Sequence, residues 1–435
     1  MNKYDVIIVG ASAAGCAAAI LYGKKGLNVA LIERRNTDTN KYKSMCTHTI
    51  QASALPIINK LGILPALQEQ RCIFTHHQIW SRHGWIKRDL TTCINAQESY
   101  GINVTRELLD PTILNEAKKY PTVTFFNNTL SEELIYQNST VCGVTIYNKD
   151  TNIKLNLYAK LIVGADGAHS KLAKLAGVNA TVNPNNRFGY FAYFKHPLFH
   201  NITDSKMWYL EPDIAYAFPN ENGVMLLGYA VEASKAKYFK TTLNDKFKQL
   251  FNELPNSSVL NDAKQISPFY ATGILKNIFR HQPPLGLTFI GDASLTLDPI
   301  AGVGITYAFL SAELLVNYTW KSLFNNAGYH SSAMNYYQAY SARMSDDYKI
   351  ICNDSLANPL QETAQLIFSN ATKNPIIANL FLDLCAKRID TKQFFQALNF
   401  LKRAQANQLK QDSNESYLKQ LTANINIPLS NHAYS

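Results

Sequence analysis

The stretch YDVIIVGASAAGCAAAILYGKKGLNVALIE, residues 4–33, decides the fold of this chain. Residues 4–9 form an apolar, β-branched run that is typical of a buried parallel strand. Residues 13–25 are rich in alanine and predict a helix closed by Gly26, and residues 27–33 predict a second strand. A strand, a helix and a second strand in this order predict a parallel sheet with helices packed on its faces.

The turn between the first strand and the helix has the spacing of a dinucleotide-binding loop. Gly10 and Gly15 fit the pattern Gly-x-Gly-x-x-Gly, and Ser12 replaces the middle glycine. Serine is small enough to let the backbone approach a pyrophosphate, which the helix N-terminus would attract. The alternative is an ordinary strand-to-helix turn without a ligand. The candidate cofactor-binding residues of this loop are Gly10, Ser12, Ala13, Ala14 and Gly15.

An acidic residue ends the second predicted strand. Glu33 stands at the distance expected for the acid that binds ribose hydroxyls in such sites. A carboxylate there favours a free 2′-hydroxyl over a 2′-phosphate, so FAD or NAD suits the site better than NADP. Arg34, the next residue, is a further cofactor-binding candidate.

Two later segments repeat the pattern of a strand that ends in a polar loop before a helix. They are LIVGADGAHS at 161–170 and LTFIGDASLTLDPIAGVGITYAFLSAELL at 287–315. Each alone could be a plain corner between a strand and a helix, but their order and spacing together predict a three-segment FAD site. The candidates here are Asp166, Gly167, Gly291, Asp292, Pro299, Gly302, Val303, Gly304 and Ile305.

With these motifs, the chain resembles the para-hydroxybenzoate-hydroxylase-like flavoproteins over about residues 1–345. That family includes single-component aromatic monooxygenases, geranylgeranyl-reductase-type enzymes and flavin halogenases. The resemblance implies that the first motif binds the ADP half of FAD, with Glu33 on the adenosine ribose. It also implies that Asp166 lies near the pyrophosphate and the approaching nicotinamide, and that Asp292 binds ribityl or ribose hydroxyls. Arg106, in VTRELLDPTIL, matches an arginine that contacts FAD, the alternative being a surface salt bridge.

The chain departs from this family at several positions. Many aromatic hydroxylases carry an arginine where Ala173 stands, and Ser294-Leu295 replaces the Ala-His that often follows the Gly-Asp pair. These departures favour the reductase-like and tailoring-oxygenase branches, and residues 45–63 and 215–224 also resemble segments of the tailoring enzymes. The halogenase signature Trp-x-Trp-x-Ile-Pro is missing, so halogenation is a minor alternative.

The predicted fold class is α/β. We expect a Rossmann-like FAD-binding domain, a substrate domain with an antiparallel or mixed sheet, and a helical C-terminal region. Aromatic, alternating segments between 185 and 280 indicate the substrate domain, and a helix over 107–119 is expected to begin through Asp110-Pro111. The expected divisions are 1–72, 106–180 and 281–345 for the FAD-binding domain, 73–105 and 181–280 for the substrate domain, and 346–435 for the helical region.

Composition narrows the partners and the compartment. Forty-two Lys and Arg against 32 Asp and Glu give a formal net charge of +10, but the basic residues are scattered, so no nucleic-acid partner is expected. Seven cysteines without a Cys-x-x-Cys pair favour a reducing, cytoplasmic location without zinc, other metal or disulfide framework. No stretch predicts a transmembrane span, and the N-terminal apolar run is interpreted as strand and helix. We expect a monomer or homodimer.

The expected chemistry follows from the flavin and the aromatic strands. Tyr190, Tyr193, Trp208 and Tyr216 are substrate-pocket candidates, although aromatic residues at strand spacing also form plain core. His48 could orient substrate or move a proton, the alternative being a satisfied loop histidine. The predicted function is an FAD-dependent monooxygenase that uses transient NAD(P)H and O₂ to hydroxylate or epoxidise a hydrophobic or aromatic small molecule. A geranylgeranyl-reductase-type ene-reductase, a halogenase and a non-catalytic flavin-binding scaffold are the alternatives.

Overall fold

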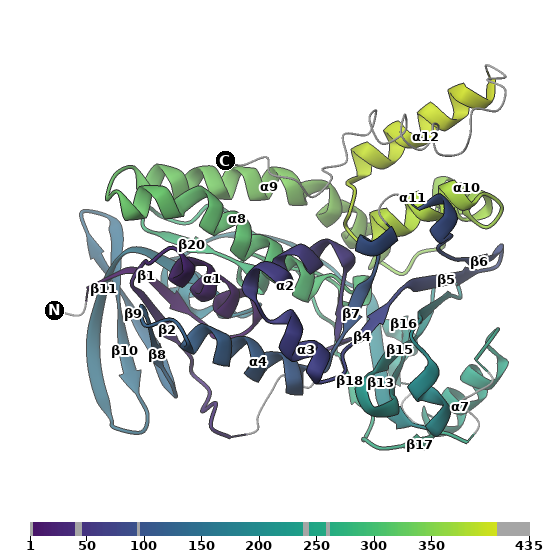
Figure 1. The fold of residues 1–435 in the computed structure, drawn as a ribbon, viewed down its shortest axis with the longest axis horizontal. Helices are drawn as coiled ribbons and strands as arrows, with labels where there is room; N and C mark the ends of the chain where they lie inside the picture. Colours follow the sequence, from purple (N-terminus) through teal and green to yellow (C-terminus); the bar gives the residue numbers. More distant parts are fainter. Residues whose placement is uncertain (1–2, 40–45, 94–95, 238–242, 258–261, 407–435) are drawn as a thin grey trace.

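The computed structural model describes residues 3–39, 46–93, 96–237, 243–257 and 262–406. Its first sheet contains the predicted parallel core (Figure 1). The parallel strands, in spatial order, are β8 (Val123–Phe126), β2 (Val29–Ile32), β1 (Lys3–Val9), β11 (Ile153–Gly164) and β20 (Leu287–Phe289). The first half of β11 also pairs antiparallel with β10 (Thr140–Asn148), which pairs with β9 (Thr129–Gln137).

Helices cover the faces of this sheet. The alanine-rich α1 (Ala13–Lys24) packs against α8 (Gly304–Phe324), which packs in turn on the long α9 (Tyr329–Asp354). Small side chains let α1 approach its neighbours closely, and the residues from Ala13 to Tyr22 are all buried. Shorter helices α2 (Leu55–Leu61), α3 (Leu64–Glu69) and α5 (Lys171–Leu175) complete this part.

One helix lies within one residue of its expected range, 107–119, but is not entered where the sequence indicated. α4 spans Arg106–Lys118, so the expected start at Asp110-Pro111 is wrong and Pro111 lies inside the helix. Proline there has no N–H to donate to the carbonyl of Glu107, and the helix continues with that bond missing. The buried ion pair between Arg106 and Asp110, one helical turn apart, stabilises the earlier start.

The aromatic segments form an eight-stranded sheet. Its strands are β17 (Lys264–Gln265), β13 (Arg187–Lys195), β16 (Val224–Glu232), β15 (Ile214–Asn220), β14 (Ser205–Tyr209), β5 (His77–Ser81) and β6 (Gly84–Ile86), with β18 (Tyr270–Ala271) also paired to β13. Helix α7 (Leu243–Glu253) packs on one face, which we call the outer face. The inner face meets Ile300, in the loop that precedes α8.

Two small sheets connect these parts. One consists of β3 (Thr49–Ile50), β7 (Gly101–Asn103) and β4 (Ile73–Thr75). The other consists of β12 (Ala180–Asn183), β19 (Asn277–Arg280) and β21 (Leu295–Thr296). β21 belongs to the third predicted cofactor segment, so the second small sheet ties that segment to residues outside it.

The C-terminal part is helical, as the sequence predicted. It consists of α10 (Glu362–Ala371), α11 (Pro375–Cys385) and α12 (Thr391–Ala406), drawn in yellow in Figure 1. α10 and α11 cover the β5–β6 end of the eight-stranded sheet. The amphipathic stretch expected near 391–410 matches α12, and its last residues lie outside the described part. The α/β fold class is confirmed. Among the helices of the described residues, none has the length and hydropathy that a membrane span needs.

Candidate functional site

The three predicted cofactor segments meet at one edge of the parallel sheet. A Cβ added to Gly10 would lie 2.3 Å from the carbonyl oxygen of Ala165, and one added to Gly15 would lie 1.8 Å from that of Gly10. A Cβ on Gly291 would lie 2.9 Å from the Cβ of Ala14. The first segment therefore touches the second and the third, where β1, β11 and β20 all end. Loops at the carboxyl edge of a parallel sheet are where such folds bind ligands.

The N-terminus of α1 is open to a ligand. Ser12 is the N-cap, with an extended backbone, but its side chain accepts no bond from the helix, and the first turn contains no acidic residue. The Ser12 hydroxyl instead accepts a 2.6 Å bond from Arg106 Nη2. Uncapped N–H groups at a helix N-terminus suit a phosphate.

Glu33 is buried beside this loop. Its Oε2 accepts a 2.9 Å bond from Ala11 N, and its Oε1 accepts bonds from the backbone N and the Nε of Arg35 at 2.9 and 3.0 Å. Burial alone would raise the pKa of Glu33, but the bonds from Arg35 and Ala11 outweigh it and lower the pKa. Arg34 is exposed, and its carbonyl accepts a bond from Lys149. The sequence pointed to Arg34 as a cofactor-binding residue, whereas Arg35 is the arginine that binds Glu33. The two residues are adjacent, so only the direction of each side chain distinguishes them.

The second segment contains a carboxylate with one unpartnered oxygen. Asp166 Oδ2 accepts the backbone N–H groups of Lys171 and Leu172 at 2.7 and 3.1 Å, at the start of α5. Within the described residues, Asp166 Oδ1 is buried and has no hydrogen-bond partner. Gly167 adopts a φ of +84°, and a Cβ there would meet nothing within 4 Å. A buried acceptor without a partner is what a ligand with hydroxyl groups would satisfy.

The third segment leads from β20 into the 21-residue helix α8. Gly291 and Asp292 lie in a single helical turn after β20, and Pro299 begins another. Gly302 ends that turn with a φ of +62°, Val303 caps α8, and a Cβ on Gly304 would meet nothing within 4 Å. Ile305, next in α8, is buried.

These loops fit FAD. They offer a pyrophosphate the open N-terminus of α1, ribose hydroxyls the Glu33 carboxylate, and further sugar hydroxyls the unpartnered Asp166 Oδ1. The N-terminus of α8, in the third segment, adds backbone N–H groups. Among the described residues, no group of three or more His, Cys, Asp or Glu side chains could hold a metal ion.

A chain of hydrogen bonds leads from the first cofactor loop to the eight-stranded sheet. Arg106, 3% exposed, binds Ser12 and donates from Nε to Asp110 Oδ1 at 2.7 Å. Its backbone N–H donates to His48 Nδ1 at 3.2 Å. His48 Nε2 lies 2.5 Å from the hydroxyl oxygen of Tyr193, on β13. Residues far apart in sequence thus connect the dinucleotide loop to the inner face.

The direction of these bonds fixes the protonation of His48. Because the Arg106 N–H donates to Nδ1, that nitrogen carries no proton, and the proton of the neutral ring is on Nε2. Burial, followed by the charge of Arg106, lowers the pKa of His48 to about 4. At neutral pH the ring is therefore uncharged, and Nε2–H donates to the Tyr193 oxygen. His48 positions Tyr193, whose hydroxyl keeps a proton of its own.

The four aromatic candidates divide between the two faces of the sheet. Tyr193 and Tyr216 lie on the inner face. Tyr190 and Trp208 lie on the outer face, where Tyr190 OH donates to Ala236 O at 2.8 Å and Trp208 Nε1 donates to Pro255 O at 3.1 Å. The structure does not bring these two to His48. The sequence could have separated Tyr190 from Tyr193, because residues three apart on a strand point to opposite faces.

Tyr216 occupies a slot that a glycine leaves. A Cβ on Gly228, its partner on β16, would lie 2.0 Å from the Tyr216 Cζ. Burial raises the pKa of Tyr216, and the nearby Asp298 and Cys46 raise it further. The ring therefore lies on the inner face close to the loop before α8.

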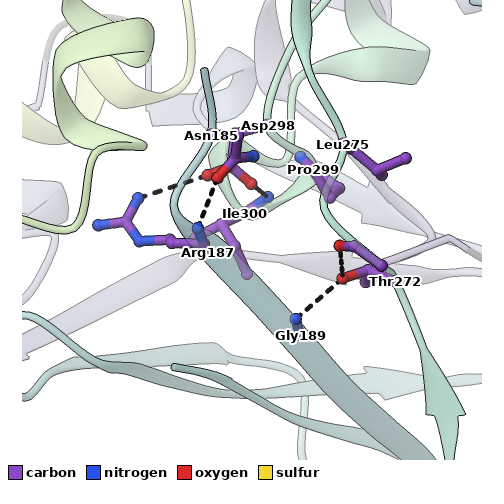
Figure 2. A pocket seen from close by; sticks show the side chains of 9 residues that line it. Asn185, Arg187, Gly189, Thr272, Leu275, Asp298, Pro299 and Ile300 are labelled. Carbon is purple, nitrogen blue, oxygen red and sulfur yellow. Dashed lines mark hydrogen bonds and ion pairs between the residues drawn. The ribbon is translucent and has the colours of Figure 1, made fainter. Parts of the chain in front are cut away.

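A small cavity lies between the start of β13 and that loop (Figure 2). Arg187 Nη1 lies 2.6 Å from Asp354 Oδ2 and 3.5 Å from Asp298 Oδ2. Burial raises the pKa of Asp298, and Arg187 opposes the rise. The cavity, about 10 Å³, has room for about one water molecule. Sequence reasoning missed Arg187 and Asp298. The residues that line the cavity are Asn185, Arg187, Gly189, Thr272, Gly273, Leu275, Asp298, Pro299 and Ile300.

Comparison with known proteins agrees with this geometry. A family described as FAD binding domain matches residues 3–317. Digeranylgeranylglycerophospholipid reductase 1 of Methanococcoides burtonii is 26% identical over 318 residues, which cover 71% of this chain and 72% of that protein.

Two solved structures share the fold. The flavin-dependent brominase Bmp2 superposes with a TM-score of 0.72 at 17% identity, covering 92% of this chain and 99% of the brominase. The p-nitrophenol 4-monooxygenase PnpA from Pseudomonas putida superposes with a TM-score of 0.70 at 16% identity, covering 89% of this chain and 99% of that enzyme. At these identities the superpositions show a shared fold, and the reaction has to be argued from the site.

Proposed function

Because the chain belongs to the FAD binding domain family, we propose that it is a monooxygenase that uses FAD, NAD(P)H and O₂ to hydroxylate or epoxidise a hydrophobic or aromatic small molecule. The observation that carries the proposal is the His48–Tyr193 pair. It orients one hydroxyl of this mostly apolar and aromatic face, beside the loops that fit FAD.

The inner face supplies a site that excludes water. Bound FAD supplies the transfer of electrons from NAD(P)H to O₂. The buried apolar side chains of this face bind the hydrophobic body of the substrate, and an enclosed apolar site protects a reduced cofactor from side reactions with water. The buried residues of the face are Phe191, Ile214, Tyr216, Phe218, Leu226, Ala230 and Ile300.

The hydroxyl of Tyr193 is the group on this face that His48 orients. Its oxygen accepts a hydrogen bond from His48 Nε2–H, which orients the phenol, and its hydroxyl is the group proposed to bind an oxygen atom of the substrate. His48 acts through Tyr193 and is a positioning residue. Its lowered pKa keeps it neutral, so the orientation persists at neutral pH.

The test is whether oxygen enters the product. The purified chain is supplied with NADH or NADPH and a panel of phenolic, polyketide and terpenoid compounds, and NAD(P)H oxidation and O₂ consumption are followed together. A monooxygenase incorporates one atom from isotopically labelled O₂ into the product. If a compound is turned over as well without O₂ as with it, the proposal is wrong. If FAD binds but no compound stimulates NAD(P)H oxidation, a non-catalytic scaffold replaces it.

A second candidate is an ene-reductase that saturates an isolated alkene of a lipid. It is favoured by one observation, namely that the curated relative described above is a digeranylgeranylglycerophospholipid reductase. An apolar face would hold an isoprenoid chain, and the Tyr193 hydroxyl could donate the proton that alkene reduction requires. With a digeranylgeranyl phospholipid as the probe and no O₂ present, this candidate predicts a product that gains hydrogen and no oxygen.

A further inference from the structure

An arginine outside the three cofactor segments joins two of them. Arg280 ends β19 and is 8% exposed. Its Nη2 donates to the carbonyl of Ala168 at 2.6 Å, and its Nη1 donates to that of Ala293 at 2.8 Å. Nη1 also lies 3.4 Å from the carbonyl of Asp292. One guanidinium therefore connects the loop after Asp166 to the loop after Asp292.

The charge of Arg280 sits among the acidic groups of the same loops. Burial lowers the pKa of Arg280, while the carboxylates of Asp166 and Asp292 oppose that change. A guanidinium donates in two fixed directions from one plane, which lets it bind carbonyls on two separate loops at once. A lysine carries the same charge on a single nitrogen and cannot reproduce this fork.

The strand that carries Arg280 follows the third segment. Ile278 and Phe279 pair with Thr296 and Leu295 of β21, and the Arg280 N–H donates to Ser294 O at 3.0 Å. At the other end of β19, the Oδ1 of the buried Asn277 accepts the Asp298 N–H at 2.8 Å. β19 thus contacts the third segment from 294 to 298, and Arg280 extends this contact across to the second segment.

We infer that Arg280 is a positioning residue of the cofactor site, which sets the separation of the loops after Asp166 and Asp292. The buried Ala173, in the helix after Asp166, has a methyl side chain without a donor, so it cannot make such bonds between the two loops. The inference rests on the proposed location of FAD across these loops. Since Arg280 does not contact the first segment in the bonds described, it should matter for the part of FAD beyond the ADP half.

The experiment compares two ligands on three variants of the full-length chain. FAD and ADP are titrated into FAD-stripped wild type, Arg280→Met, Arg280→Lys and, as a control for charge, the exposed Lys276→Met on the same approach to β19. Loss of the fork should weaken FAD binding by about 10- to 100-fold in both Arg280 variants. ADP binding, and FAD binding by Lys276→Met, should stay within about threefold of wild type.

Each other result contradicts a defined part of the inference. FAD binding of wild-type strength in Arg280→Met overturns it, and an equal loss of FAD and ADP affinity shows a general defect of the fold. Recovery of FAD binding in Arg280→Lys means that charge, and not the fork, is what matters. If Arg280→Met fails to fold by circular dichroism, Arg280→Lys decides. Absence of FAD binding in wild type would instead remove the proposed function.

Discussion

The cofactor loops and the inner face of the eight-stranded sheet are built in opposite ways. The loops pack with their backbone atoms in direct contact, as where Gly15 packs on the carbonyl of Gly10 five residues away. The inner face is held by side chains from distant strands and loops, as where His48 meets Tyr193, 145 residues away. Backbone contacts leave no room for any side chain, whereas side-chain contacts can be replaced one at a time. Substitutions should therefore act on the cofactor edge as a whole and on the inner face locally.

The largest effect is expected at Gly15. In Gly15→Ala the Cβ would lie 1.8 Å from the Gly10 oxygen, so one of two backbone segments must move. We expect loss of bound FAD and a lower melting temperature. The control is Gly304→Ala, where a Cβ meets nothing within 4 Å, so the FAD-free chain should melt as wild type does. Yellow, FAD-loaded protein from Gly15→Ala would contradict the close contact.

Arg106 should come next, because its guanidinium is paired inside the protein. Arg106→Met leaves the Asp110 carboxylate buried without its partner, which should cost about 3–5 kcal/mol of unfolding free energy in urea titrations. Arg106→Met combined with Asp110→Asn should recover most of that loss. FAD affinity should stay weakened in the double variant, since the bond to Ser12 is still missing. Full recovery of both would assign Arg106 a purely structural role.

On the inner face the expected change is in turnover alone. Tyr193→Phe removes the hydroxyl that His48 orients and should lower kcat by about 10- to 100-fold, with bound FAD unchanged. His48→Gln should lower kcat less. The double variant should be no slower than Tyr193→Phe, because His48 acts through that hydroxyl. Additive losses would show that His48 contacts the reacting groups itself.

The buried His48 should also make stability depend on pH. Its pKa falls from 6.5 to about 4 on folding, so between these values the unfolded chain binds a proton that the folded chain does not. The free energy of unfolding should therefore fall as pH is lowered through this window, by up to about 1.4 kcal/mol per pH unit from this group. Urea unfolding measured across this window should show a shallower fall in His48→Gln than in wild type.

The smallest effect is expected on the outer face. Tyr190→Phe removes one buried hydrogen bond, to the carbonyl of Ala236, and should cost about 1 kcal/mol of stability. Turnover per folded molecule should not change, because the face that Tyr190 occupies is covered by α7 and not by the cofactor loops. A loss of kcat comparable to that of Tyr193→Phe would mean that the two faces are not functionally separate.

Local signals in the sequence predicted much of this molecule. The run of residues 4–33 gave the strand, helix and second strand because hydrophobic periodicity and glycine spacing act over a few residues. The expected range of α4, 107–119, lies within one residue of the observed helix, but the expected entry at Asp110-Pro111 is wrong because Pro111 is a strong local signal. The ion pair between Arg106 and Asp110, one helical turn apart, stabilises the first turn instead. Whether these loops bind the cofactor as proposed stays a prediction.

What depends on register or on distant strands could not be predicted. Arg280 stands in an ordinary alternating stretch, and only the pairing of β19 with β21 brings it to the cofactor loops. Trp208 and Tyr216 face opposite ways because of how β14 and β15 align, which no local pattern reports. Arg187 and Asp298 also form an ion pair between segments that lie far apart in the sequence.

The slot that Gly228 leaves for Tyr216 has a consequence for how this protein can diversify. Position 228 sits beneath the ring, so even an added methyl group would have to displace it. The position of the Tyr216 ring, and with it the shape of the inner face, therefore depends on a residue that lies beneath the ring. A lineage could alter the range of molecules it accepts by a single change at 228, while the residues lining the face stay the same.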